Sequence, residues 1–252
     1  MRESLLVLVM LKALKATRCK RWLRKRNMKV AFDIHQMPDQ STLLLEEGVS
    51  LGRLQPVFTR LQVGAMTYVR SDSELSNVSL IGRFCSIGNG VTLGQEKAGH
   101  PMNWVSSHPF QYSATQHFYS ESGRPAEIGH DVWIGRDAMV MEGVKVSTGA
   151  VIAARSLVTR DVPPYAVVAG MPARIVRYRH PPEIVAGLLA SAWWELPINL
   201  LTGLSVDDPE QFLRELAARA ERDHASYKRV EINSRGCREL FCLVPSTWTD
   251  MA

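Results

Sequence analysis

The sequence predicts a mainly β fold, a parallel β-helix with one long inserted loop and C-terminal α-helices. Three observations support this prediction. Aliphatic residues recur every six positions in two stretches of the chain. About thirty residues without that period separate the two stretches. Beyond residue 180, apolar residues take the spacing of helices instead.

The N-terminal segment carries most of the positive charge. Of the net charge of +5, residues 1–29 contribute ten cations and one anion, so the rest of the chain is mildly acidic. The apolar run 5–11 is too short for a membrane span, and the charge order differs from that of a secretory signal. We expect residues 1–44 to be a basic, partly helical extension.

That extension favours peripheral contact of residues 1–29 with an anionic membrane surface. The alternatives are a solvated extension and a translation start at Met28. The contact prediction rests on one apolar helical face, formed by Leu5, Leu6, Val9, Ala13 and Ala16.

The cysteines predict no disulfide framework. Cys19, Cys85, Cys237 and Cys242 are scattered and include no CxxC pair, which argues against a disulfide scaffold and a zinc site. We therefore expect a reducing compartment. The protein would be cytoplasmic, in association with the inner face of the membrane if the N-terminal segment binds there.

A period of six defines the predicted β-helix, residues 45–178. Neither an α-helix nor a hairpin sheet produces this period, whereas a chain that turns a corner every six residues does. Three such sides close a coil of eighteen residues, and coils stack about 4.8 Å apart. Except after Leu93, where the repeat breaks off, the residue four positions after each aliphatic one is no larger than valine. The aliphatic positions are Val63, Val69, Leu75, Ile81, Ile87, Leu93, Ile128, Ile134, Val140, Val146, Ile152 and Val158.

The loop, residues 95–127, interrupts the period. It contains GHPMNWVSSHPFQYSATQHFY, whose aromatic residues and histidines argue against disorder. A loop of this length in a compact fold is usually functional.

Several motifs in fixed order resemble the xenobiotic and sugar acetyltransferases of the hexapeptide-repeat superfamily. They are IGRFCSIGNGVTLG (81–94), Gly99-His100, SHPF (107–110), IGHDVWIG (128–135), VVAGMPARIV (167–176) and WWELP (193–197). The resemblance covers residues 60–215. It implies a left-handed β-helix, acetyl transfer from acetyl-CoA to a hydroxyl, and a homotrimer with active sites between subunits.

This resemblance makes His100 the general base. The acceptor hydroxyl must lose its proton as its oxygen attacks, and a histidine that is neutral near pH 7 can take it. His108 is the rival base, or a brace of the acceptor pocket. His117 and His130 are weaker candidates, and we expect His130 at an outward surface position. The same resemblance implies an acceptor site formed by Tyr68, Trp104, Ser107, His108 and Phe110.

Acetyl-CoA is the implied co-substrate, and no metal is expected. Family members often carry lysine in place of Arg160 and asparagine in place of Met171, so the contact at Met171 stays open. The alternative for Arg174 is a solvated charge. By motif, the pantetheine arm would meet Trp133 and the backbone of Ala153, Ala154 and Ser156, and the adenine and phosphates would lie near Arg160, Met171, Pro172, Ala173 and Arg174.

Two C-terminal helices are expected within residues 179–225, packed over the end of the β-helix. The first runs from Pro181 to Trp194. The second begins with Asp208 as cap, Pro209 at the first helical position and Gln211 as capping-box partner. Residues 226–252 form a tail to which the sequence assigns no role.

The acceptor is the open part of the function. The loop sequence favours a sugar of a surface polysaccharide or its precursor, and the alternative is an antibiotic of the chloramphenicol or streptogramin type. A zinc-dependent carbonic anhydrase on this fold needs an HxxxxH pair, which the seven histidines do not provide. A non-catalytic solenoid would leave the loop with His100 unexplained. We expect no nucleic-acid partner.

Overall fold

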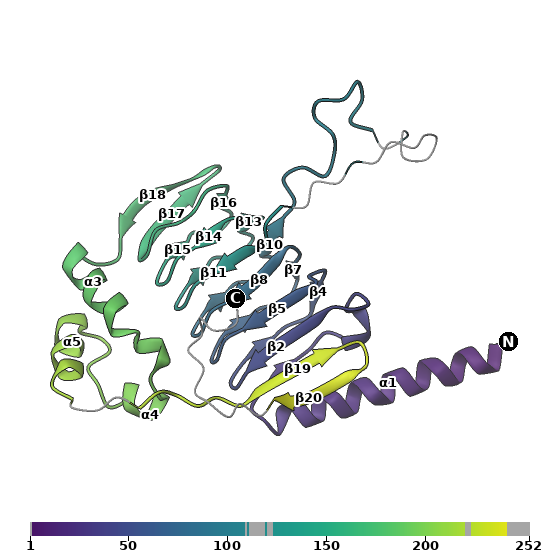
Figure 1. Ribbon diagram of the computed structural model, residues 1–252, viewed down its shortest axis with the longest axis horizontal. Helices are drawn as coiled ribbons and strands as arrows, with labels where there is room; N and C mark the ends of the chain where they lie inside the picture. The colour runs from purple at the N-terminus through teal and green to yellow at the C-terminus, as the bar shows by residue number, and fades with distance from the viewer. Residues whose placement is uncertain (1, 109, 111–118, 120–122, 220–222, 241–252) are drawn as a thin grey trace.

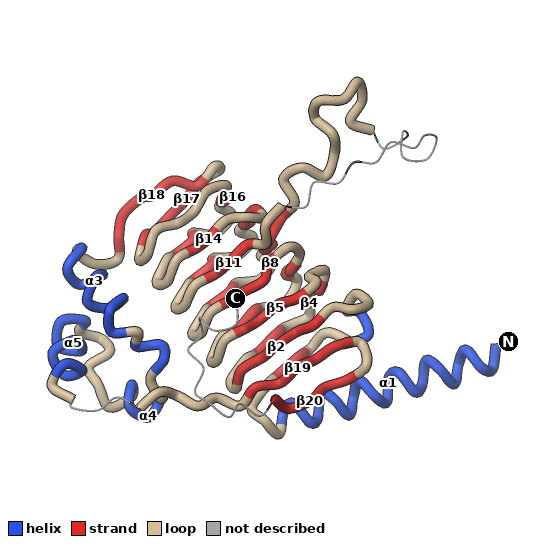
Figure 2. The backbone as a smooth tube through the Cα atoms, in the orientation of Figure 1, coloured by secondary structure: helices blue, strands red, loops and turns tan. Residues whose placement is uncertain are grey.

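Stacked parallel coils form the body of the molecule, with three sheets as the sides of a triangle (Figures 1 and 2). The computed structural model describes residues 2–108, 110, 119, 123–219 and 223–240, and residues 2–12 only as backbone. Each full coil passes from sheet B through sheet A to sheet C. The parallel β-helix predicted from the sequence is confirmed.

The strands of the three sheets are short, as a chain with a corner every six residues requires. Sheet A contains β1 (Lys29–Val30), β3 (Ser50–Leu51), β6 (Tyr68–Val69), β9 (Ser86–Ile87), β12 (Trp133–Ile134), β15 (Val151–Ile152), β17 (Ala166–Gly170) and β18 (Ala173–Tyr178). Sheet B contains β2 (Thr42–Glu46), β5 (Arg60–Val63), β8 (Val78–Ile81), β11 (Ala126–Ile128), β14 (Lys145–Val146), β19 (Arg229–Asn233) and β20 (Gly236–Leu240). Sheet C contains β4 (Leu54–Pro56), β7 (Ser73–Leu75), β10 (Thr92–Gln95), β13 (Met139–Met141) and β16 (Leu157–Val158).

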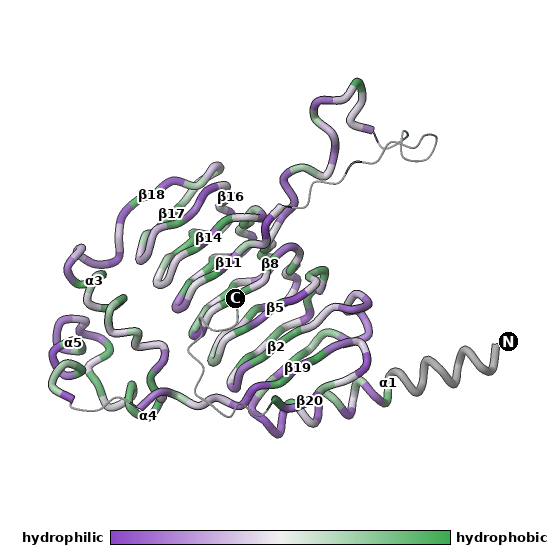
Figure 3. The backbone as a smooth tube through the Cα atoms, in the orientation of Figure 1, coloured by the Kyte–Doolittle hydropathy of each residue, from purple (hydrophilic) through white to green (hydrophobic). Residues whose placement is uncertain are grey.

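The twelve aliphatic positions of the repeat form the core, and each is at most 2 % exposed. Burial of each such side chain contributes roughly 1.5–3 kcal/mol. Apolar residues recur along every coil in Figure 3. The small position at Ser79 is an exception, because Val78 is buried there instead. The cause is a shift of register between β8 and β11, after a tight turn in which the Val78 N–H donates to the Ser76 carbonyl.

The corners require a backbone conformation that most residues avoid. One residue at many of the corners has a positive φ, between 52° and 75° in the set named below. Glycine enters this region freely, and aspartate and asparagine enter it more readily than other residues. The corner residues therefore repeat every six positions, like the core. They include Met66, Asp72, Phe84 and Gly90 before the loop, and Asp131, Asp137, Gly143, Gly149 and Arg155 after it.

The β-helix begins earlier than the predicted residue 45. Strand β1 pairs in parallel with β3, and β2 pairs with β5, so the first coil starts at Lys29. The six-residue pattern is indistinct in this first coil, so the sequence did not indicate it. The coil also includes a short 3₁₀ helix, η1 (Ile34–Gln36). Upstream, α1 (Arg2–Arg24) covers the N-terminal end of the solenoid with buried Ala16, Cys19 and Leu23. Its other end projects beyond the coils (Figure 1).

The predicted apolar face of the N-terminal helix is therefore partly wrong, because Ala16 contacts the protein core and not a surface partner. In the part of the chain that the structure describes, no helix has the length and apolar character needed to cross a membrane.

The tail returns to the N-terminal end of the molecule. Strand β19 pairs antiparallel with β2, and β20 pairs with β19, so a hairpin from the C-terminus extends sheet B. A disulfide joins Cys19 of α1 to Cys237 of β20. The expectation of unpaired cysteines is wrong for these two, and the argument for a reducing compartment loses its basis. The fold brings together two cysteines that lie 218 residues apart in the sequence.

The C-terminal helices lie along one side of the coils, not over their end as expected (Figure 1). They form a second core with the solenoid residue Tyr165. Asp208 caps α5 as predicted, with its carboxylate accepting from the Gln211 N–H, but the Gln211 side chain bonds to Glu215 and so does not complete the capping box. The helices are α3 (Pro182–Ser191), η2 (Trp193–Glu195), α4 (Ile198–Leu201) and α5 (Pro209–Ala217).

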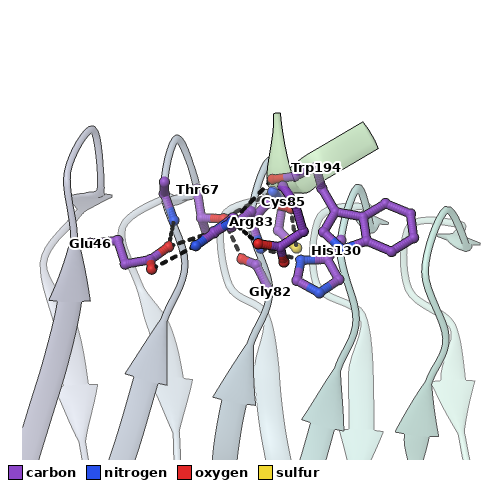
Figure 4. A network of polar contacts seen from close by, with 9 residues as sticks. Glu46, Thr67, Gly82, Arg83, Cys85, His130 and Trp194 are labelled. Carbon is purple, nitrogen blue, oxygen red and sulfur yellow. Dashed lines mark hydrogen bonds and ion pairs between the residues drawn. The ribbon is translucent and has the colours of Figure 1, made fainter. Parts of the chain in front are cut away.

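A buried arginine attaches this helical segment to the solenoid (Figure 4). The Arg83 guanidinium makes two hydrogen bonds to the Glu46 carboxylate, at 2.7 and 3.0 Å, and one to Glu195 at 2.6 Å. It also donates to the Trp194 carbonyl at 3.3 Å and lies 5.0 Å from the ring of Tyr227. Burial raises the pKa of Glu195, and the Arg83 charge opposes that rise. Three segments far apart in sequence thus share one cation.

Replacing Arg83 by methionine should destabilise the fold by about 3–5 kcal/mol, because two buried carboxylates would lose their cation. Urea unfolding monitored by circular dichroism measures this change. The control is Arg155→Met, since the Arg155 side chain is 79 % exposed and its ion pair with Asp137 is long, with 3.6 Å between Nε and Oδ2. That control should cost less than about 1 kcal/mol. Equal stability of Arg83→Met and the control would contradict the prediction.

Candidate active site

The long loop leaves the solenoid at one corner of the triangle. It departs after β10 of sheet C and returns at β11 of sheet B. In an uninterrupted coil a few residues make that turn. The described part of the loop projects away from the coils in Figure 1. The predicted loop, residues 95–127, matches this interruption to within a residue or two at each end.

His100 lies near the start of the loop and is exposed. Its Nδ1 is 2.8 Å from the carbonyl oxygen of Ser107. A carbonyl only accepts hydrogen bonds, so Nδ1 carries the proton and donates it. In neutral imidazole the other nitrogen, Nε2, then has a free lone pair, and it has no partner among the described residues. This is the tautomer that a general base acting through Nε2 requires.

His108 has the opposite arrangement. Its Nδ1 accepts a hydrogen bond from the Phe110 N–H at 3.1 Å, so the neutral ring carries its proton on Nε2. Its own N–H donates to the Ser106 hydroxyl, and its ring stacks near that of Phe110. These contacts suit a brace of the loop better than a base. His117 lies outside the described residues.

Other acceptor-site candidates divide between the loop and the solenoid. In the loop, Trp104 packs edge to face against Tyr119, with ring centroids 5.9 Å apart. Phe110 is exposed, and the Ser107 carbonyl holds His100. Tyr68 is different, because it lies on β6 of sheet A with Arg70 over its ring.

Tyr68 and Trp133 lie in one row on the outer face of sheet A. The register pairs Tyr68 with Ser86, and Ser86 with Trp133, so one strand separates the two aromatic side chains. Trp133 is 59 % exposed and lines a groove of about 320 Å³ with Val151 and Val167.

Two arginines that the sequence analysis missed close this groove, namely Arg177 of β18 and Arg179 beyond it. Arg179 pairs with Asp131 at 2.8 Å and donates to the Gly149 carbonyl. Burial raises the pKa of Asp131, while Arg179 opposes that shift. The cation-rich run RIVRYRH (174–180) could have pointed to them.

The remaining cofactor candidates occupy the last coils. Ala154 is exposed at a corner between β15 and β16, while Ser156 is buried. The Ser156 backbone is already engaged, since its N–H donates to Ala153 and its carbonyl accepts from Met139. Its N–H is therefore not free to donate to a ligand. Arg160, Met171, Pro172 and Arg174 are all exposed, after β16 or at the β17–β18 turn, and Ala173 is half-buried there.

His130 is buried, so the prediction of a surface position is wrong. Its ring stacks on Trp194 with centroids 4.9 Å apart, and its Nδ1 accepts from the Arg83 N–H. Burial and the nearby Arg83 charge lower the pKa of His130 to about 3. The outward position in the repeat was correct, but Trp194 covers it. The side chain serves the attachment of the helical segment and is not a second base.

One chain does not bring the two halves of the predicted site together. In a triangular coil, the corner between sheets B and C lies opposite sheet A. The loop with His100 leaves at that corner, whereas Tyr68 and Trp133 point outward from sheet A.

Metal ligation finds no support in the described ranges, which contain no group of three His, Cys, Asp or Glu side chains placed to hold an ion. Cys85 is buried, and burial raises the pKa of its thiol to about 12, so it is no nucleophile at neutral pH.

Sequence comparison identifies relatives with a shared activity. No family model matches the chain. A probable macrolide acetyltransferase from Lysinibacillus sphaericus is 32 % identical over 162 residues, which cover 61 % of this chain and 87 % of that protein. The chain belongs to the hexapeptide-repeat acetyltransferase family. The resemblance drawn from the motifs is thereby confirmed.

Other acetyltransferases are more similar to the chain over a shorter part of it. Chloramphenicol acetyltransferases from Escherichia coli and Klebsiella aerogenes are 41 % and 42 % identical over 139 and 134 residues. These segments cover 52 % and 50 % of the chain, which spans just under two thirds of the two relatives. A solved hexapeptide-repeat acetyltransferase from Vibrio cholerae is 22 % identical, with a TM-score of 0.44 over 67 % of this chain and 93 % of that one.

Proposed function

We propose that the chain is an acetyl-CoA-dependent O-acetyltransferase in which His100 is the general base. The observation that carries the proposal is the hydrogen bond from His100 Nδ1–H to the Ser107 carbonyl, which leaves Nε2 free to accept a proton. His108, the rival, holds its proton on Nε2.

The reaction proceeds by direct transfer. His100 Nε2 takes the proton of the acceptor hydroxyl while that oxygen attacks the thioester carbonyl carbon. The resulting imidazolium is stabilised by the Ser107 carbonyl, which accepts from Nδ1–H throughout. Collapse of the tetrahedral intermediate breaks the carbon–sulfur bond. The proton on Nε2 passes to the departing thiolate, so the products are the acetyl ester and free coenzyme A.

The outer face of sheet A fits acetyl-CoA. The cofactor has a narrow pantetheine arm and anionic phosphates, and it needs a groove that combines apolar contacts with cations. Trp133, Val151 and Val167 supply the apolar contacts, and Arg177 supplies a cation at the rim. Arg160 and Arg174 are exposed in the last coils, where the phosphates would lie. Ala154 offers a free corner backbone, whereas Ser156 does not.

The site is completed by a second copy of the chain. Because the loop leaves at the corner opposite sheet A, the loop of one subunit would meet sheet A of a neighbour. A closed ring of three such heterologous contacts gives a homotrimer with three equivalent sites. The exposed apolar side chains of β18, Ile175 and Val176, lie on the sheet that such a contact would use.

Two acceptor classes have separate support. The relatives that align over about half of the chain or more include chloramphenicol acetyltransferases and a probable macrolide acetyltransferase, which favours an antibiotic hydroxyl. The loop sequence around Ser107 and His108 favours a sugar of a polysaccharide or its precursor. Both are hydroxyl acceptors and both use the same base, so the mechanism holds for either class.

The N-terminal helix provides peripheral contact with an anionic membrane at the cytoplasmic face, where acetyl-CoA is available. Lys15, Arg18 and Arg21 are exposed on α1, and Arg235 of the C-terminal hairpin lines the same groove as Lys15 and Arg18. Exposed Leu14 and half-buried Trp22 add apolar surface. Such a mixture suits the headgroup region of a bilayer.

His100→Ala should lower kcat by about a thousandfold, since general-base catalysis contributes roughly 10²–10⁴. Acetyl-CoA affinity should stay within about twofold, because the contacts that bind the cofactor in the proposed site lie on sheet A and not at the base. Free thiol release, with a panel of sugars, chloramphenicol and macrolides, measures turnover and decides the acceptor class. His108→Ala is the matched control. Its kcat should fall less than about tenfold, because His108 braces the loop and does not act as the base. Near wild-type turnover by His100→Ala would overturn the assignment.

Mixed oligomers test the shared site. His100→Ala and Trp133→Glu should each abolish most activity alone, because one removes the base and the other blocks the groove. Co-expression in equal amounts should restore about a quarter of the wild-type activity, since random trimers place an intact loop against an intact sheet A in that fraction of sites. No recovery in oligomers shown by mass spectrometry to be mixed, or a monomer by light scattering, would contradict a shared site.

If α1 contacts an anionic membrane, the protein should sediment with phosphatidylglycerol vesicles at low salt and bind little to phosphatidylcholine vesicles. A variant with Lys15→Glu, Arg18→Glu and Arg21→Glu should lose at least about tenfold in affinity, since each surface cation contributes about 1 kcal/mol. The control Arg155→Glu changes an exposed arginine of the solenoid and should bind as wild type does. Unchanged binding by the triple variant would exclude this surface.

A further inference from the structure

A buried carboxylate holds the base of the active-site loop. Glu142 follows β13 and is 5 % exposed, although nothing in the proposed reaction uses it. Its Oε1 accepts the N–H of Lys97 at 2.9 Å, and its backbone N–H donates to the Gln95 carbonyl at 2.9 Å. Both contacts fix the limb of the loop that leads out to His100, three residues beyond Lys97.

Asn77 fixes the returning limb and connects it to Glu142. Its Nδ2 donates to the Gly123 carbonyl at 2.7 Å and to Glu142 Oε2 at 2.9 Å. Its backbone carbonyl accepts from the Ala126 N–H at 2.8 Å. The Glu142–Asn77 pair therefore bonds to both limbs of the loop at the point where they separate.

Two glycines make this junction possible. Gly94 has a φ of +79°, and a Cβ there would lie only 2.1 Å from the Asn77 carbonyl oxygen. A Cβ on Gly123 would lie 2.3 Å from the Glu142 carboxylate carbon. Glycine at these two positions lets the backbone of each limb lie directly against Asn77 and Glu142. Any residue with a Cβ would prevent this approach.

The pairing register also changes at this point. Next to the departing limb, the β10–β13 register shifts between Leu93 and Gln95. Next to the returning limb, the β8–β11 register shifts between Ala126 and Glu127. The regular ladder therefore stops fixing the chain where the loop begins, and the two side chains take over that role.

We propose that the Glu142–Asn77 pair positions the loop, and through it His100, for acetyl transfer. The inference rests on the proposed function of His100. A base displaced by about 1 Å can cost about a hundredfold in rate, so a rigid anchor three residues away has a direct effect on turnover. The pair acts through the loop and touches neither substrate in the proposed mechanism.

The chemistry of the pair makes its identity testable. Glu142 faces two donors, the Lys97 N–H and the Asn77 amide, and a carboxylate has an acceptor oxygen for each. Glutamine at position 142 would place a donor against one of them. Aspartate at position 77 would place a second carboxylate against the first. In the double variant, the introduced glutamine amide can donate to the introduced aspartate and still accept from Lys97. The pair is then rebuilt with reversed polarity, although the Gly123 carbonyl lacks its donor.

The experiment compares Glu142→Gln, Asn77→Asp and the double variant with wild type. Each single variant should lower kcat at least about tenfold while KM for acetyl-CoA changes less than about twofold, because the cofactor face is untouched. In the double variant, log kcat should regain at least half of the decrease seen in the single variants. The control Glu127→Gln, on the neighbouring exposed surface of β11, should keep wild-type kcat.

Hydrogen exchange provides a readout independent of turnover. The Lys97 amide should exchange at least about tenfold faster in Glu142→Gln and return toward the wild-type rate in the double variant. If wild type shows no acetyl transfer, the proposed function fails while exchange still tests the anchor. Wild-type kcat and Lys97 exchange in a folded Glu142→Gln would overturn the inference. An equal loss of kcat in single and double variants, with unchanged exchange, would also overturn it.

Discussion

The stacking of one coil on the next constrains every other feature of the molecule. Each strand must meet its neighbour about eighteen residues later, because its backbone groups have no other partners. An insertion can therefore enter only at a corner, where the ladder already turns. The loop obeys this rule: it leaves after β10 and returns at β11, and the coils on either side keep their pairing. The scaffold stays regular while one corner carries the inserted loop.

The same constraint explains where charge is buried. The interior of the coils is filled mainly by small and aliphatic side chains, so charged groups gather just outside it at the corners. There, ion pairs and hydrogen bonds offset the cost of burying charged groups. Arg83 is satisfied by Glu46 and Glu195, and Glu142 is satisfied by backbone and amide donors. The first cluster attaches the helical segment to the solenoid, and the second anchors the loop. Both join segments that lie far apart in the sequence.

The sequence determines what is periodic and misses what depends on contact between distant segments. The six-residue period predicted the core and the loop because each coil repeats the same local environment. His130 was misplaced because its cover, Trp194, comes 64 residues later and outside the repeat. The disulfide between Cys19 and Cys237 and the hairpin beside β2 escaped for the same reason. Spacing showed that His100 lies in the loop, but only the Ser107 contact gave its tautomer.

The two halves of the proposed site are fixed by different parts of the structure. The cofactor half is part of sheet A, so Trp133 is fixed by the ladder that also fixes the core. The acceptor half belongs to the loop, whose sequence the ladder does not restrict beyond its two anchored limbs. Sequence similarity to relatives that lies in the coils therefore supports a shared cofactor more strongly than a shared acceptor. Chloramphenicol and a sugar both present a hydroxyl, and in the proposed site they would be distinguished by the loop residues around His100 together with Tyr68 of sheet A.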